Sequence, residues 1–221
     1  MSNAFRARGH ECYTVDWDSK FPSTLHIDIM ELTAERILQE FGHPDIIWSG
    51  NDCTTFSVAA IGHHRRKNKT TGSLDPKTEK AARADMVNIH TLDLIRELKP
   101  HFFFIENPMG GLRSMDYMQG IPKHLITYCQ YGFPYRKATD IFTNHPRTEF
   151  KPPCKNGDPC HQAAPRGTTL GLQAIKDKAL RSAYPPPLCE HIVDICERYF
   201  DMEPLPVKFG NQKQLLFNYG D

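Results

Sequence analysis

Residues 48–57 read Trp48-Ser49-Gly50-Asn51-Asp52-Cys53-Thr54-Thr55-Phe56-Ser57, and the rest of the chain is organised around them. The apolar run that ends at Trp48 predicts a buried strand, and the small polar residues after it predict a loop that leaves the sheet. Cys53 should therefore lie at the rim of a sheet, where open α/β folds bind ligands. A second joint of this kind is Phe102-Phe103-Phe104-Ile105 followed by Glu106-Asn107-Pro108. A thiol and a carboxylate at two strand ends can perform covalent chemistry if they meet in space.

The pattern around these joints predicts an α/β fold. A helix capped by Asp75, with Pro76 at its first position, should end at Lys99-Pro100 and lead at once into the Phe-rich strand. Strand, helix and strand joined so tightly imply a parallel pair with a crossover. Further strands are expected at 11–15, 25–29, 125–129 and 140–143, and further helices at 32–41 and 185–200.

The bulk properties limit the class of protein. The chain has 221 residues and a formal net charge of +1, which fits one α/β domain with a small appendage and gives no global field for nucleic acid. We divide it into a core at 1–144, an irregular insertion at 145–182 and a helix and tail at 183–221. The 7 cysteines are an odd, scattered set, which favours reduced thiols in a cytosol. No run is long enough to span a bilayer, and no signal-peptide pattern opens the chain.

Several short motifs together resemble one enzyme family. In chain order they are Val15-Asp16-Trp17-Asp18, Asp28-Ile29, Cys53-Thr54-Thr55-Phe56-Ser57, Glu106-Asn107, Tyr131-Gly132-Phe133-Pro134 and Pro186-Pro187-Leu188. The set resembles the DNA (cytosine-5) methyltransferase family, and more narrowly its short phage- or prophage-type members. The resemblance implies a Rossmann-like sheet that binds S-adenosylmethionine, with residues 145–182 as a small target-recognition insertion. It also implies a monomer that acts on double-stranded DNA in the cytoplasm of a bacterial host.

The resemblance implies a role for each motif residue. Cys53 would add to C6 of a flipped cytosine, and Glu106, with its pKa raised by burial, would hold or protonate N3. Asn107 would orient the loop that carries Glu106. The cofactor would be held by Asp16, Trp17, Asp28 and Ile29, with the first acid on its ribose and the second facing its adenine.

Basic residues supply the expected contacts to DNA. Arg65, Arg66 and Lys67 belong to a polar loop at 62–72, which should be mobile without DNA and lie beside the cleft. The alternative is a solvated basic loop. Arg136 and Lys137 follow the Gly-Phe-Pro motif and are candidates for contacts to the base or a phosphate.

The chain departs from the family pattern in three places. The glycine-rich turn that cradles the cofactor's methionine end is not found before residues 4–10, and residues 213–221 are a candidate replacement by circular permutation. Asp52 stands where the family has proline, and its charge should raise the pKa of Cys53. Lys137 and Thr139 stand where the family has two arginines.

These departures leave alternatives open. One is a catalytically impaired or truncated relative that binds DNA without the cofactor, and another is a thiol enzyme acting on a free pyrimidine. A separate question is whether the chain binds zinc through Cys154, Cys160 and His161, with His145 as a further candidate. Because the spacing is not a pair of CxxC hooks and adjacent Cys160-His161 is an awkward chelate, we assign no metal site from the sequence.

Overall fold

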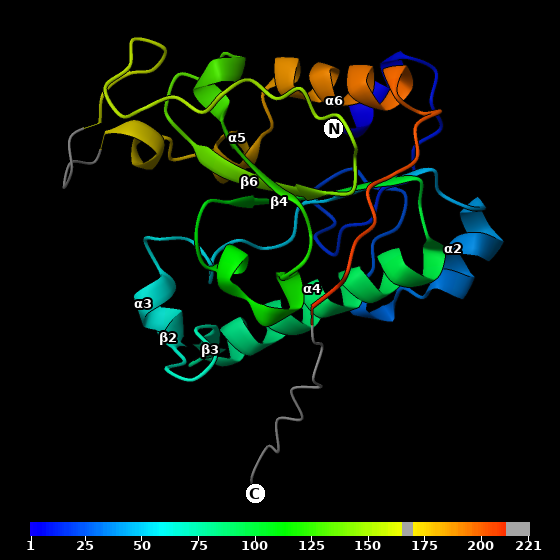
Figure 1. Ribbon diagram of the computed structural model, residues 1–221, viewed down its shortest axis with the longest axis horizontal. Helices are drawn as coiled ribbons and strands as arrows, with labels where there is room; N and C mark the ends of the chain where they lie inside the picture. The colour runs from blue at the N-terminus through cyan, green and yellow to red at the C-terminus, as the bar shows by residue number, and fades with distance from the viewer. Residues whose placement is uncertain (165–169, 211–221) are drawn as a thin grey trace, which may run out of the picture.

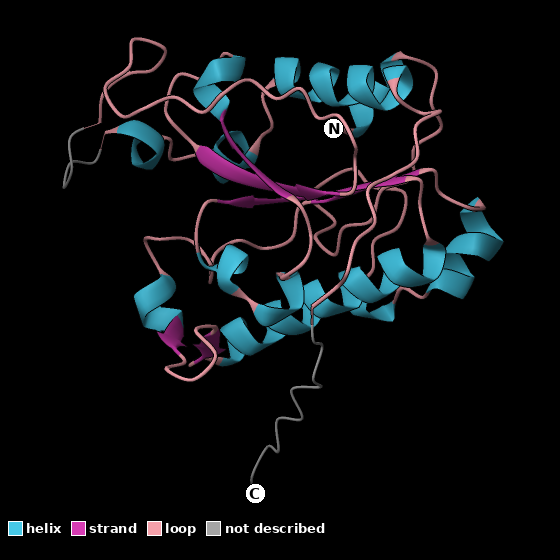
Figure 2. Cartoon of the chain, in the orientation of Figure 1, coloured by secondary structure: helices cyan, strands magenta, loops and turns pink. Residues whose placement is uncertain are grey.

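The computed structural model describes residues 1–164 and 170–210 of the chain, and it is a mixed α/β fold. A four-stranded sheet lies between two layers of helix, with α4 (Glu79–Leu98) on one face and α6 (Pro186–Arg198) on the other (Figures 1 and 2). Strand order is β1 (Ile46–Ser49), β4 (Phe102–Pro108), β6 (Ala138–Thr143), β5 (Lys123–Thr127). The strand pair β1 and β4 is parallel, as the crossover through α4 requires, and β6 runs antiparallel to both β4 and β5.

The Phe-rich run forms the centre of the molecule because both faces of β4 are covered. Phe102 and Phe104 pack with α6 residues such as Leu188 and Ile192, whereas Phe103 and Ile105 pack on the α4 side. Successive residues of a strand point to opposite faces, so an unbroken apolar run fits a strand buried on both sides. This layering leaves Glu106 at the far end of β4, where the apolar run stops.

Two predictions about the segment before α4 are wrong. Residues 62–72 are not a simple mobile loop: α3 (Ile61–His64) leads into an antiparallel hairpin of β2 (Arg65–Lys67) and β3 (Leu74–Pro76). Asp75 and Pro76 therefore belong to a strand. The side chain of Thr78 accepts a hydrogen bond from the amide of Ala81, and this cap starts α4.

The N-terminal part has less strand than predicted. Helix α1 (Ser2–Ala7) is followed by extended chain. Within the described residues, the predicted strands at 11–15 and 25–29 pair only through one parallel bridge between Val15 and Leu25. Then come the 3-10 turn η1 (Ile29–Glu31) and the predicted helix α2 (Ala34–Phe41).

Residues after β6 agree with the expected loss of periodicity. The described part of 145–182 holds only η5 (Gly171–Ala174) and α5 (Lys178–Ser182), and α6 restores regular structure. Three further 3-10 turns lie earlier: η2 (Gly111–Ser114), η3 (Asp116–Met118) and η4 (Tyr128–Tyr131). Beyond α6 the chain returns across the sheet to the α4 side, where Val207 and Phe209 pack against the core (Figure 1).

The proposed permuted strand at 213–221 lies outside the described residues. Among the residues that are described, no helix combines the length and apolar character needed to cross a membrane.

Candidate active site

The loop after β1 is fastened to α4 before it reaches Cys53. Asn51 Nδ2 donates to Asn88 Oδ1 at 3.2 Å and to Thr91 Oγ1 at 3.1 Å, both on α4. The Cys53 carbonyl then accepts the amides of Phe56 and Ser57 at 3.1 and 3.0 Å, which closes a tight turn. These bonds fix the backbone that carries the thiol.

The same loop packs closely on the chain that follows β4. The amide of Gly111 donates to the Phe56 carbonyl at 2.7 Å, and Ser57 pairs with Gly110. A Cβ at Gly110 would lie 2.2 Å from that carbonyl oxygen, so only glycine allows this approach. The two strand ends that the sequence singled out are thus joined by backbone contacts.

Glu106 lies buried in β4 with one hydroxyl partner. The Tyr128 hydroxyl donates to Glu106 Oε1 at 2.9 Å. Burial raises the pKa of the Glu106 carboxyl, while Lys137 and the Tyr128 hydrogen bond act in the opposite direction. The direction of this shift is the one predicted for an acid that must carry a proton.

Cys53, Glu106 and Lys137 form one electrostatic group. Burial raises the pKa of the Cys53 thiol most, and the carboxylates of Glu106 and Asp52 raise it further. Lys137 favours the Cys53 thiolate, and the thiolate and Glu106 in turn favour the charged form of Lys137, although burial lowers the lysine pKa overall. This mutual influence requires the Cys53 thiol and the Glu106 carboxyl to lie near one another, and a pocket shared by the two side chains stays a prediction.

Two tyrosines form part of the wall around this group. The Lys137 ammonium lies 4.4 Å from the centroid of the Tyr128 ring and donates to the Arg181 carbonyl at 3.3 Å. The hydroxyl of Tyr184 lies 2.1 Å from where a Cβ at Gly50 would be, and Glu106 Oε2 lies 4.0 Å from the same point. Gly50 is thus the residue that lets the loop pass between Tyr184 and Glu106.

Asp52 remains charged beside the thiol. Burial acts to raise the pKa of Asp52, but hydrogen bonds from Thr54 and the charge of Lys80 outweigh it and lower the pKa. The Lys80 Nζ to Asp52 Oδ2 distance is 3.5 Å. Asp52 raises the pKa of the Cys53 thiol, as predicted, although burial and Glu106 raise that pKa more.

Asn107 does not use its side chain to hold the loop. It is completely buried, and neither its Nδ2 nor its Oδ1 has a hydrogen-bond partner among the described residues. A buried side-chain amide without hydrogen-bond partners is uncommon in folded proteins. The Asn107 amide therefore has free donor and acceptor capacity directly after Glu106.

The predicted DNA contacts separate into four groups. The predicted DNA contact of Arg65 is wrong. Its side chain is 3% exposed and pairs with Asp85 at 2.9 Å beneath the hairpin, so it cannot reach a phosphate. Arg66 and Lys67 are exposed on β2, and Arg66 lies 3.8 Å from Asp75. Arg136 is half-buried and donates to the Cys154 carbonyl at 3.3 Å. Lys137 is 8% exposed and belongs with Cys53 and Glu106.

The predicted cofactor residues lie in the irregular chain between α1 and α2. Asp16 is half-buried and accepts the amide of Asp18 at 2.8 Å, and the Trp17 ring beside it is 78% exposed. Asp28 caps η1 by accepting the amide of Met30 at 2.9 Å and pairs with Arg83 on α4. Ile29 packs partly buried against the core around Leu32. Asp16 thus closes a local turn, whereas Asp28 caps η1 and pairs with Arg83, and these are ordinary uses of such acids.

The candidate zinc residues from the insertion do converge, but with a different fourth partner. Cys154, Cys160 and His161 meet Cys129 of η4, and their ligand atoms all lie within 4.8 Å of one another. His145 lies elsewhere, where its Nε2 donates to the Ile195 carbonyl at 3.2 Å.

The sequence analysis did not place Tyr128, Tyr184 or Gly50 near the site, and it predicted that Lys137 contacts the DNA. A usable signal existed only for Tyr128, because it directly follows the apolar end of β5, where Ile126, Thr127 and Tyr128 are all buried. The place of the other residues depends on contacts between distant segments. Comparison of the chain with models of known protein families and with curated proteins finds no match.

Proposed function

We propose that this protein transfers a methyl group from S-adenosylmethionine to C5 of a cytosine flipped out of duplex DNA. The observation that carries the proposal is the convergence of three groups: Cys53 in the loop after β1, Glu106 near the end of the adjacent parallel strand β4, and Lys137 just before the antiparallel strand β6. A thiol alone at a strand end is usually packing. A thiol whose ionisation depends on a buried acid and a buried ammonium is suited to nucleophilic chemistry.

The three groups fit the first half of such a reaction. C5 of cytosine is a poor nucleophile until the Cys53 thiolate forms a bond to C6. The negative charge that this addition places on the ring is relieved when Glu106 donates a proton at N3, so the raised pKa of Glu106 is useful. The Lys137 ammonium favours the Cys53 thiolate that begins this step. Once C5 has been methylated, loss of the C5 proton to water or hydroxide, breakage of the C6–sulfur bond and return of the N3 proton to Glu106 would restore the ring and release the Cys53 thiolate.

S-adenosylmethionine, when bound, supplies the electrophilic methyl group. The half-buried Asp16 carboxylate beside the exposed Trp17 ring suits a ribose next to a flat purine. Asp28 and Ile29 would approach the adenine, although the Asp28 carboxylate already contacts the Met30 amide and Arg83. Asp16 and Trp17 are therefore the stronger cofactor candidates.

The DNA would be held by side chains around Cys53 and Glu106. The target base must leave the stack to reach a buried group, so phosphates on either side need partners. Arg66 and Lys67 on the hairpin and Arg136 beyond η4 carry the exposed or half-buried charge suited to them.

Trapping on DNA that contains 5-fluorocytosine tests the proposal. Because fluorine at C5 cannot leave as a proton does, the C6–sulfur bond persists after methyl transfer. We expect a denaturant-stable protein–DNA adduct with the wild type and with the matched control Cys12→Ala, and none with Cys53→Ala. An adduct on Cys53→Ala would assign the nucleophile elsewhere, and no adduct despite bound DNA and cofactor would exclude turnover.

A DNA-binding relative without catalysis is the second candidate. It is favoured by the raised pKa of Cys53, since less thiolate is available beside Glu106 and Asp52. Calorimetry with S-adenosylhomocysteine distinguishes the two, because only the enzyme requires a cofactor site. Saturable heat would favour the methyltransferase, and DNA binding with no such heat would favour the relative.

A further inference from the structure

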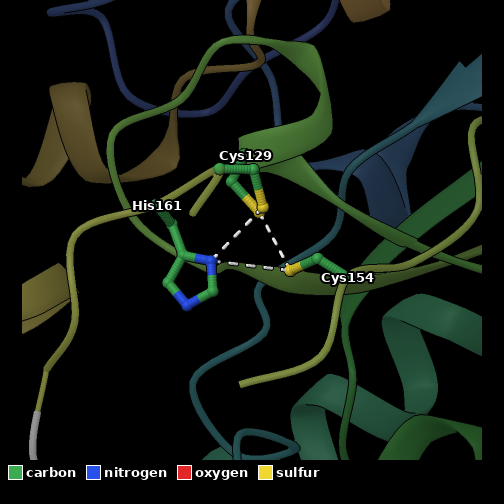
Figure 3. A group of neighbouring side chains, drawn as sticks. Cys129, Cys154 and His161 are labelled. Carbon is green, nitrogen blue, oxygen red and sulfur yellow. Dashed lines mark hydrogen bonds between the residues drawn. The ribbon is translucent and has the colours of Figure 1, made fainter. Parts of the chain in front are cut away.

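Four side chains from two separate parts of the chain converge beside the active site. Cys129 lies in η4, which follows β5 in the core, whereas Cys154, Cys160 and His161 lie in the irregular segment after β6. Figure 3 shows the sulfur atoms of Cys129 and Cys154 and a ring nitrogen of His161 directed at a common point. From this convergence we propose a structural zinc site with three thiolate ligands and one imidazole ligand.

The distances fit a tetrahedral ion. Ligands at about 2.3 Å for sulfur and about 2.0–2.1 Å for nitrogen place two thiolates about 3.8 Å apart and a thiolate and a nitrogen about 3.6 Å apart. Cys129 Sγ lies 3.2 Å from Cys154 Sγ and 3.7 Å from Cys160 Sγ. His161 Nδ1 lies 3.7 Å from Cys154 Sγ and 3.4 Å from Cys160 Sγ. A disulfide would explain one of these contacts and leave the other three unexplained.

The donor set selects the metal. Three sulfurs and one imidazole suit zinc, whereas magnesium and calcium require oxygen ligands. Zinc displaces the protons of the three thiols and takes a lone pair from His161 Nδ1, which gives a site with one net negative charge. Arg136 lies next to this charge, with its Nε bonded to the Cys154 carbonyl at 3.3 Å. Because all four ligands come from the protein, the site is closed and structural.

The segment needs such a fastening because it has almost no apolar core. Between residues 151 and 164 Cys154 is the only buried residue. Burial of apolar surface therefore cannot hold this segment in place, but a metal that joins it to η4 can. The first residue of η4 is Tyr128, whose hydroxyl donates to Glu106. The zinc would thus hold the segment and the wall of the active site in one arrangement.

Metal analysis of the full chain, purified without chelators, tests the proposal directly. We expect about one zinc per chain, with an X-ray absorption spectrum of three sulfurs at about 2.3 Å and one nitrogen at about 2.0–2.1 Å. Cobalt(II) in its place should give thiolate charge-transfer bands and the visible bands of a tetrahedral ion. A wild-type protein without metal, or one whose mass shows a Cys129–Cys154 disulfide, would overturn the proposal.

Cysteine variants test whether Cys129, the ligand that comes from the core, binds the zinc. Cys129→Ser should lose most of the zinc or replace one sulfur in the absorption spectrum, whereas Cys12→Ser, which changes a thiol elsewhere, should keep the full site. Lys155 is already exposed, so chelation of the wild type should speed trypsin cleavage after Lys155 by releasing the segment that carries it. An unchanged three-sulfur shell in Cys129→Ser would show that the core does not take part. None of these readouts depends on methyltransferase activity, so the zinc site and the proposed function can fail separately.

Discussion

Gly50 lies where the loop after β1 passes the hydroxyl of Tyr184. A Cβ there would be 2.1 Å from the hydroxyl oxygen and 3.4 Å from Cζ of the same ring. Gly50→Ala should therefore lower the free energy of unfolding by about 1–3 kcal/mol through overpacking. Urea denaturation should show most of this loss recovered in Gly50→Ala/Tyr184→Phe, because the clashing oxygen is gone. The single Tyr184→Phe variant is the control, and a double variant no better than Gly50→Ala would place the strain elsewhere.

The reactivity of Cys53 should respond to its three charged neighbours in opposite directions. Glu106 and Asp52 raise the pKa of the thiol and Lys137 lowers it. Below that pKa, alkylation follows the thiolate fraction, which changes about tenfold for each unit of pKa. Glu106→Gln and Asp52→Asn should then speed alkylation severalfold near neutral pH, with the larger effect for Glu106→Gln, and Lys137→Met should slow it.

Peptide-resolved mass spectrometry over a pH series would measure these rates, with Cys12 as an internal reference. The rate in the wild type should rise as pH rises towards the thiol pKa. If all three variants changed the rate in the same direction, the three charges would not act on Cys53 as the geometry requires.

At the scale of elements, the hairpin of β2 and β3 is fixed from below by one arginine. Arg65 Nε and Nη2 donate to the carbonyl and hydroxyl of Thr55, at 3.1 and 3.0 Å, and its guanidinium lies 3.9 Å from the Phe56 ring centroid. With its pair to Asp85 on α4, this side chain joins the nucleophile loop, the hairpin and the long helix. Its role is architectural.

Arg65→Met should cost about 3–5 kcal/mol in the free energy of unfolding, because it leaves the Asp85 carboxylate buried without its cation. The adjacent exposed Arg66→Ala should change it by about 0.5 kcal/mol or less. Burial already raises the pKa of Asp85, so the cost of Arg65→Met should shrink as pH falls and Asp85 takes up a proton. Denaturation of both variants at neutral and acidic pH measures this, and equal costs for the two arginines would contradict it.

These elements also show how far sequence reasoning reaches. The strand, helix and strand around residues 46–105 could be predicted because their apolar periodicity is local and the crossover follows from their order. The hairpin could not, because its residues are polar and its pairing depends on backbone bonds. From the sequence alone, Arg65 and Lys137 are expected to be exposed surface charges. They are buried because each lies near an acidic partner, Asp85 and Glu106 respectively, that is 20 or more residues away in the chain.

At the scale of the whole molecule, a net charge of +1 means that any affinity for DNA must come from a few local side chains. The logarithm of the affinity falls with the logarithm of salt concentration, with a slope of about 0.9 per phosphate contact. If Arg66 and Lys67 each hold a phosphate, Arg66→Ala/Lys67→Ala should reduce this slope by about 2. Fluorescence anisotropy at several salt concentrations measures it. Lys20→Ala/Arg36→Ala removes equal charge away from the hairpin, and an equal reduction in that variant would exclude a specific role for β2.

Trp17 makes the proposed cofactor region optically accessible. The chain has 2 tryptophans, and Trp48 is stacked on Phe104 with ring centroids 5.9 Å apart, whereas the Trp17 ring is 78% exposed. Replacing Trp48 by Phe would leave a single indole emitting from water. Any small molecule that covers that ring would shift its emission to shorter wavelength, so the protein carries its own fluorescent sensor for occupancy beside Asp16.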